Sequence, residues 1–299
     1  MYSQIDSNKR KSFFLIAIFI IVVVALGWFF GELIGGYGYK GLIIALLISW
    51  LMVLFSYYRG DKVALWSAGA KEIQKNDNPF VWRLIENLCI TAGLPMPRVY
   101  IIPDAALNAF ATGRDPKHAS IALTAGIIDA LEKPELEGVI AHELSHVKNY
   151  DIRIMTIVIV LAGTLALLAD FFLRSRFWGF GRRRDRDDGG LGVILLIAGI
   201  ILAILAPIAA NLIQLAISRK REFLADASGA LLTRYPQGLA NALAKISTHS
   251  NIRRASGATA HLYIANPFAG SGKFLGKLFS THPPIEERIA ALQGMEKNI

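Results

Sequence analysis

Four long apolar segments constrain most strongly what this chain can fold into. They cover residues 13–34, 41–58, 154–173 and 191–218, and each is close to or above the roughly 20 residues that a helix needs to cross a bilayer. The first segment follows a basic cluster, is too long for the apolar part of a signal peptide, and has no small-residue cleavage site after it. Hydrophobic residues make up 54% of the 299 residues, more than an ordinary soluble domain contains. We therefore predict an integral membrane protein with about four transmembrane helices, the first retained as an anchor.

The apolar segments divide the chain into four parts: a two-span membrane anchor (1–58), a first polar part (59–153), a transmembrane hairpin (154–218) and a second polar part (219–299). The first polar part has helical patterning to about Ala92, where Gly93 predicts a helix end. PRVYII reads as a strand, NAFATG and ASIALTAG around RDPKH read as a hairpin, and Pro134 predicts a helix start. The second polar part has mainly helical patterning. These patterns predict an α+β fold, mainly helical, whose single polar domain is split by the membrane hairpin.

Basic residues beside the apolar segments predict the orientation in the membrane. The net charge is +9, but the basic residues are not interleaved with aromatic ones, so anionic lipid headgroups explain the charge better than nucleic acid. Within about 15 residues of a span end, the face that holds the N-terminus and both polar parts carries eleven Lys or Arg, and the other face carries seven. The positive-inside rule then places both polar parts in the cytoplasm. The arginine-rich loop between the third and fourth segments opposes this assignment.

The segment HELSH, residues 142–146, predicts a zinc site. Residues four apart share one helix face, so His142 and His146 can direct their rings at one ion. Glu143 lies about 100° round the helix from His142, which is beside the metal and not on it, as a general base for water requires. The longer metzincin pattern needs glycine and histidine where this chain has Asn149 and Ile152, so the third ligand must come from farther along the chain.

Glu222, in SRKREFLADASGA, is the best candidate for that third ligand. Asp226 lies one turn further on the same face, where it can hold a ligand histidine by its second ring nitrogen. A charged pair four apart on a helix is usually solvated surface. Here, however, a polar stripe in the fourth apolar segment leads directly onto Glu222, and polar groups in a membrane helix normally face protein or water. The stripe consists of Asn211, Gln214 and Ser218.

HELSHVKNYD, the later REFLADASGA, NAFATG and a late THPP together resemble the HtpX group of membrane zinc endopeptidases, relatives of the CAAX prenyl proteases. The resemblance covers most of the chain. It implies one Zn²⁺ per subunit on His142, His146 and Glu222, with Glu143 as general base and Asp226 behind the ligands. It also implies ATP-independent degradation of misfolded or damaged membrane proteins in the bacterial inner membrane, with the site on the cytoplasmic side.

Two further segments gain a possible role from this resemblance. Asn108, Ala109 and Phe110 match a family motif on an edge strand, where an extended substrate could pair; an ordinary hairpin strand is the alternative. His282 could stabilise the tetrahedral oxyanion. The alternative there is a histidine that marks a helix start, with Arg288 as a surface residue.

Three other sequence patterns predict no catalytic or ligand-binding role. GSGK, residues 270–273, lacks the first glycine and the hydroxyl residue of a phosphate-binding loop, so we predict no nucleotide. Cys89 is the only cysteine and is typical of a buried apolar position. Gly27, Gly31 and Gly35 form a small-residue ridge that we expect to pack against the second segment.

Two other functions share these features. A prenyl-protein protease would use the same zinc site and differ only in substrate. A membrane scaffold that keeps the motif without turnover would bind zinc and cleave nothing.

Overall fold

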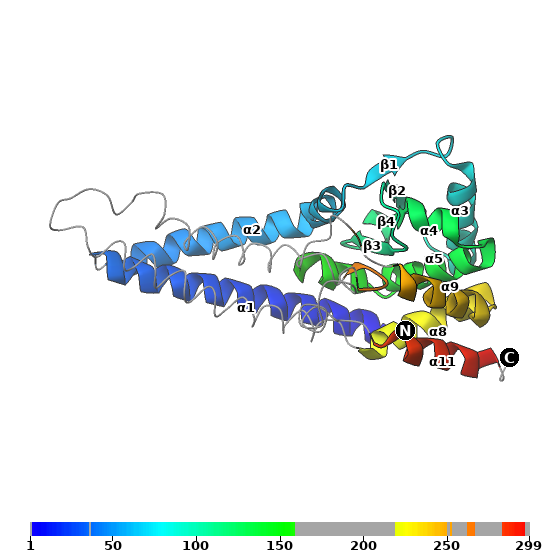
Figure 1. Ribbon diagram of the computed structural model, residues 1–299. Coiled ribbons are helices and arrows are strands. Elements are labelled where there is room, and N and C mark those ends of the chain that lie inside the picture. Colours follow the sequence, from blue (N-terminus) through cyan, green and yellow to red (C-terminus); the bar gives the residue numbers. More distant parts are fainter. Residues whose placement is uncertain are drawn as a thin grey trace.

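The computed structural model describes residues 2–35, 37–158, 219–249, 252, 262–266 and 283–296. The third apolar segment beyond residue 158, the whole fourth segment with its polar stripe, and His282 lie outside these ranges. In the part that is described, two long helices extend away from a body in which helices cover a small sheet (Figure 1).

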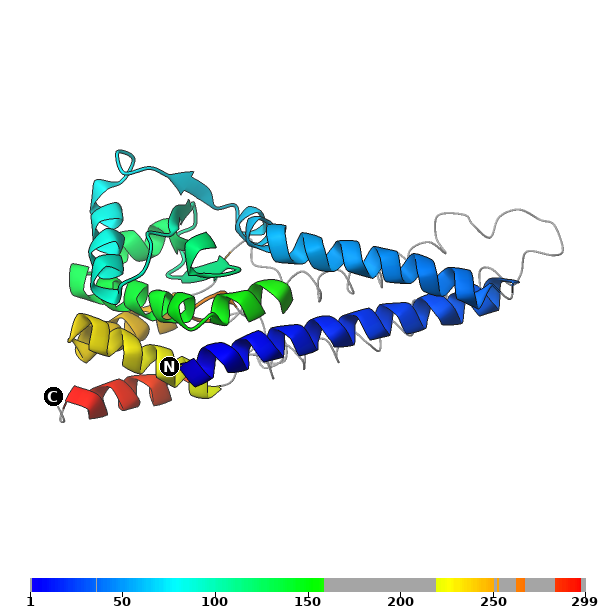
Figure 2. The same cartoon turned by 180° about the vertical axis from the view of Figure 1, so that it is seen from behind.

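The two long helices, α1 (Tyr2–Gly35) and α2 (Gly38–Ser67), run side by side in both views (Figures 1 and 2). Two stretches, Ile5–Phe29 within α1 and the whole of α2, are long and apolar enough to cross a membrane. Only 17% and 22% of the residues in their most apolar windows are buried inside the protein, so few of these side chains lie in a protein core, unlike those of a soluble core helix. α2 continues nine residues beyond the predicted end at Tyr58, to Ser67.

Glycines bring these two helices into contact, as the small-residue ridge predicts. A Cβ on Gly27 would overlap the Cβ of Ala45, and a Cβ on Gly31 would lie 2.9 Å from the carbonyl oxygen of Tyr37. Close backbone approach of this kind is how helices associate where lipid removes the hydrophobic driving force.

Gly27→Ala should therefore separate α1 from α2, whereas Gly294→Ala should not. Nothing lies within 4 Å of a Cβ built on Gly294, although both glycines are helical. Overpacking costs about 1–3 kcal/mol, while alanine for glycine in an open helix position gains up to about 1 kcal/mol. Thermal unfolding in detergent measures both variants. An equal midpoint for the two would show that the ridge does not hold the helices.

A four-stranded sheet forms the upper layer of the body, with strand order β1-β2-β4-β3. Its strands are β1 (Lys71–Ile73), β2 (Arg98–Ile102), β3 (Ala109–Gly113) and β4 (Ala119–Thr124). β2 and β4 are parallel, and β1–β2 and β3–β4 are antiparallel. The predicted strand and hairpin are confirmed; the hairpin turn contains the short helix η1 (Pro116–His118), which Asp115 caps. β1 corrects the helical reading of residues 59–92, because three residues are too short to show a strand period.

Helices form the other layers of the body. They are α3 (Pro79–Ala92), α4 (Ala125–Ala130), α5 (Lys133–Lys148), α8 (Arg219–Thr233), α9 (Pro236–Thr248) and α11 (Ile285–Glu296). α3 ends where predicted, at Gly93 with φ 67°. α5 packs between the sheet and the pair α8 and α9 (Figure 1). Cys89 is 3% exposed, and burial raises the pKa of its thiol to about 11, as expected for a structural cysteine.

Candidate metal centre

Helix α5 carries the HELSH segment, and its start is well defined. Pro134 occupies the first turn, where its missing N–H costs nothing, and Glu132 and Glu135 cap the helix reciprocally. The helix then buries His142, Glu143 and His146, each less than 5% exposed. Such a run of polar residues in a core is stable only if the groups bind one another or a ligand.

Helix α8 supplies the facing side of the site. Glu222, Asp226 and Gly229 are spaced by four and three residues, so they share one helix face. A Cβ on Gly229 would lie 3.0 Å from the backbone nitrogen of His142, so only glycine allows this close approach without a shift. This contact brings the Glu222 carboxylate, itself fully buried, onto the two histidines.

The three residues predicted as ligands converge on one point. The two Nε2 atoms of His142 and His146 are 3.1 Å apart, and the Glu222 carboxylate oxygens lie 3.8 Å from the first and 3.6 Å from the second. All three candidate ligand atoms lie within 4.8 Å of one another. Ligand atoms about 2.1 Å from a tetrahedral zinc are separated by about 3.4 Å. The observed spacing therefore fits a zinc ion between them.

Each histidine ring is oriented by a carboxylate on its other nitrogen. Asp226 Oδ1 lies 2.9 Å from His142 Nδ1, and Asp151 Oδ2 lies 3.1 Å from His146 Nδ1. A carboxylate at Nδ1 fixes the tautomer that leaves the Nε2 lone pair available for a metal. Asp226 was proposed from the sequence for this position. Asp151 was missed, although it lies only five residues after His146.

Arg288 is a second residue that the sequence did not indicate. The surface position considered for it is wrong: it is 0% exposed, and α11 places its guanidinium behind the site. Its Nε and Nη2 donate to the two oxygens of Asp226 at 2.8 and 2.7 Å, and Nη1 lies 3.9 Å from Glu222. Burial alone would raise the pKa of Asp226, but the Arg288 charge, its hydrogen bonds and His142 lower it overall.

Glu143 lies beside the ligands and differs from the other acids in its partners. The backbone N–H of Ala111 on β3 favours the charged form of its carboxylate, while Oε1 has no hydrogen-bond partner among the described residues. Burial raises the pKa of Glu143, and the neighbouring Glu222 adds to this, against the opposing effect of both histidines. A buried carboxylate with an unbonded oxygen beside a ligand cluster suits a group that accepts a proton from water.

The charges of the site also favour a divalent cation. Four buried carboxylates (Asp151, Glu143, Glu222, Asp226) face two buried guanidinium groups (Arg221, Arg288), which leaves two negative charges. Burial alone would lower the pKa of His146, but the hydrogen bond to Asp151 and the surrounding carboxylates raise it to about 9. The surroundings therefore favour positive charge at the ligand point, and the donor set of two imidazoles and one carboxylate suits zinc.

The edge of β3 is partly occupied. The side chain of Asn108 donates to the Ala265 carbonyl at 3.0 Å, and Ile264 N–H donates to the Ala109 carbonyl at 3.0 Å. Phe110 is buried with its ring 5.2 Å from that of Tyr263. Residues 262–265 thus lie along the start of β3. A substrate strand on this edge would have to pair beyond Ala109, near Ala111 and Glu143.

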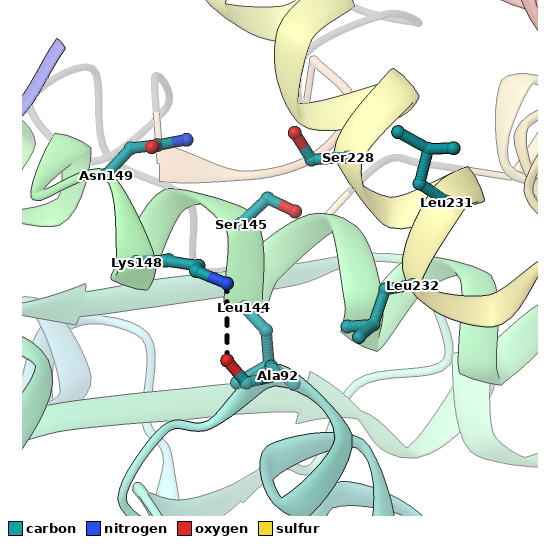
Figure 3. A pocket seen from close by; sticks show the side chains of 8 residues that line it. All are labelled: Ala92, Leu144, Ser145, Lys148, Asn149, Ser228, Leu231 and Leu232. Atoms are coloured by element: carbon teal, nitrogen blue, oxygen red, sulfur yellow. Dashed lines mark hydrogen bonds between the residues drawn. The ribbon is translucent and has the colours of Figure 1, made fainter. Parts of the chain in front are cut away.

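A cavity of about 280 Å³ lies between α3, α5 and α8. Lys148 spans it to donate to the Ala92 carbonyl at 3.2 Å (Figure 3). None of the three candidate ligands lines it; the lining residues are Ala92, Leu144, Ser145, Lys148, Asn149, Ser228, Leu231 and Leu232.

Arg288→Ala should destabilise the body strongly, because it leaves the Asp226 carboxylate buried beside His142 without its guanidinium partner. Removing one partner of a buried ion pair costs about 3–5 kcal/mol. The midpoint of thermal unfolding measures this loss, and Glu287→Ala, an exposed neighbour on α11, is the matched control. Equal midpoints for Arg288→Ala and Glu287→Ala would contradict the role assigned to the ion pair.

The sequence profile of peptidase family M48 matches residues 75–296. Protease HtpX homologs match almost end to end. One from Tropheryma whipplei (strain TW08/27) is 47% identical over 296 residues, covering 99% of this chain and 98% of the relative. Another, from Caldanaerobacter subterraneus subsp. tengcongensis, is 46% identical over 298 residues, with 99% and 98% covered.

Among solved structures, S. mikatae Ste24p has a similar fold, with a TM-score of 0.51. The alignment covers 98% of this chain and 66% of that protein, at 17% sequence identity. At this identity the likeness concerns the fold alone.

Proposed function

This chain belongs to peptidase family M48 and is a membrane metalloprotease; on that premise we propose that it is a zinc-dependent, ATP-independent endopeptidase that degrades misfolded or damaged membrane proteins. The observation that carries the proposal is the convergence of His142, His146 and Glu222 within 4.8 Å, with Glu143 buried beside them. The family relationship favours an enzyme over a scaffold that only binds metal.

The proposed reaction is hydrolysis of a peptide bond by water. Zinc, when bound, supplies Lewis acidity: it lowers the pKa of water and polarises the scissile carbonyl. His142 and His146 hold their Nε2 lone pairs toward the ligand point because Asp226 and Asp151 fix their Nδ1 atoms. Glu143 takes a proton from the attacking water and then delivers it to the leaving amine. Its raised pKa makes its carboxylate a stronger base than an exposed glutamate.

The substrate main chain is proposed to bind along β3. Asn108, Ala109 and Phe110 would shape the start of this edge, with the Asn108 amide holding residues 262–265 in place. The pairing region would then be the stretch of β3 near Ala111, whose N–H favours the charged form of Glu143. His282 is proposed, from the family resemblance, as a donor to the oxyanion.

The proposed setting is the bacterial inner membrane, with the active site on the cytoplasmic face. α1 and α2 support membrane insertion, and the excess of basic residues on the face that holds the N-terminus supports the orientation. We propose that residues 154–218 form a hairpin of two further spans that splits the peptidase domain. A reporter fused into the arginine-rich loop tests this: activity outside the cytoplasm supports the hairpin, and cytoplasmic activity contradicts it.

Substrate class is tested with the purified, zinc-loaded chain in liposomes. A destabilised membrane protein should be cleaved faster than its folded parent without ATP, because only unfolded segments can lie extended along a strand edge. Prenylated peptides form a second arm. Rapid cleavage next to the lipidated cysteine, with no cleavage of unfolded membrane protein, would reject quality control in favour of a prenyl-protein protease.

A further inference from the structure

The N-terminal end of α1 contacts the metal centre through the side chain of Asn8. This asparagine is 1% exposed, although few residues in the apolar part of the same helix are buried. Its Nδ2 donates to Asp151 Oδ1 at 2.6 Å and to the Asn149 carbonyl at 2.7 Å. Both views show the N-terminus of α1 beside α8 (Figures 1 and 2). A membrane helix thus donates a hydrogen bond to the carboxylate that orients His146.

The Asp151 carboxylate is held from three sides. Oδ2 lies 3.1 Å from His146 Nδ1, while Oδ1 accepts from Arg221 of α8 at 2.7 Å and from Asn8 of α1 at 2.6 Å. Asp151 is 3% exposed, so water does not replace these partners easily. Hydrogen bonds to a charged group are stronger than those between neutral groups. The position of this carboxylate therefore depends on α1 and on α8.

The turn that carries Asp151 needs such support. Tyr150 has a φ of 61°, in the left-handed region that non-glycine residues rarely adopt. This conformation turns the chain sharply between α5 and the helix that begins at Asp151, and it returns Asp151 to His146. The Asn8 amide bonds to Asn149 and to Asp151, the residues on either side of Tyr150, and so stabilises the turn at both ends.

We propose that Asn8 is a positioning residue for the metal centre. We further propose that packing of the N-terminal end of α1 against the turn at residues 149–151 is energetically coupled to zinc binding. Asn8 acts through Asp151 on His146 and touches neither metal nor substrate. This inference rests on the zinc site proposed above. Because coupling is reciprocal, zinc binding should also hold α1 in place.

The test measures zinc affinity of the purified full chain in detergent by competition with a chelator, in a Glu143→Gln background that should not hydrolyse peptide bonds. Asp151→Ala should weaken zinc about 10–100-fold, as loss of an outer carboxylate does. Asn8→Ala should weaken it about tenfold, since it removes one bond to that carboxylate. Ser12→Ala is the matched control: Ser12 is buried one turn further along α1, and among the described residues its hydroxyl bonds the Asn8 carbonyl and not Asp151. Its affinity should stay within about twofold of the parent.

Equal zinc affinity of Asn8→Ala and Ser12→Ala would overturn the coupling, whereas a parent chain that binds no zinc would overturn the zinc site itself. A second measurement needs no variant in α1. Removing zinc from the parent should speed hydrogen exchange of the amides in residues 2–12, while exchange in β1 and β2 stays the same. Unchanged exchange in residues 2–12 would also overturn the coupling.

Discussion

Glu143→Gln should abolish peptide hydrolysis while leaving the metal bound. Glutamine has nearly the same shape as glutamate, so it can occupy the buried position beside His142. It cannot take a proton from water or return one to the leaving amine. Loss of a general acid–base group lowers the rate about 10²–10⁴-fold, so turnover of an unfolded substrate should fall to the background of the assay.

The measurement pairs the initial cleavage rate with zinc content per chain. Glu137→Gln is the matched control, because Glu137 lies on the same helix and is part-exposed. Its ion pair with Lys133 is weak, since the two charged groups are 3.8 Å apart and the lysine is exposed. The control should keep both activity and zinc. A Glu143→Gln chain that holds zinc and cleaves as fast as its parent would remove Glu143 from the mechanism.

Glu222→Gln should have the second largest effect, and it should act on the metal first. The change removes the only carboxylate in the candidate ligand set and leaves His142 and His146 as a two-histidine site. Outer residues cost about 10–100-fold in affinity when replaced, so a direct ligand should cost at least about 100-fold. Activity should follow zinc occupancy and recover in part when zinc is added in excess.

Zinc titration distinguishes this defect from that of Glu143→Gln, which added zinc should not rescue. Glu286→Gln, an exposed acid on α11, is the matched control and should bind zinc as the parent does. If Glu222→Gln kept the parent affinity, Glu222 would not be a ligand. Treating the parent with a chelator should reproduce the Glu222→Gln defect and should be reversed by zinc.

Structural features that depend on residues within a single helix or hairpin could be predicted from the sequence. A spacing of four residues puts His142 and His146 on one face of a helix whatever else the chain does. Gly27 and Gly31 form their ridge by the same rule, and the α3 end at Gly93 follows from the left-handed conformation that glycine allows. The β3–β4 hairpin was recognisable because two β-rich runs flank a short polar turn.

Two of the residues that the sequence missed, Arg288 and Asn8, make contacts between elements far apart along the chain. Arg288 follows Asp226 by 62 residues, and Asn8 precedes Asp151 by 143. An arginine near a helix start and an asparagine beside basic residues both look like surface positions, because nothing near them in sequence shows what they meet. β1 was not predicted for a different reason: its three residues pair with β2 but are too few to show the alternating pattern of a strand.

By itself, the sequence determined which functional groups and membrane segments the protein has: a two-histidine helix with an adjacent carboxylate, a second acidic helix, and apolar segments long enough for a bilayer. These are properties of composition and short-range period. The tertiary structure alone decided that Glu222 faces both histidines, that Asp226 and Asp151 each hold one ring, and that Arg288 and Asn8 hold those carboxylates. Burial is the physical reason: a charge in a core must find a partner, and only the packing of α1, α5, α8 and α11 brings those partners within reach.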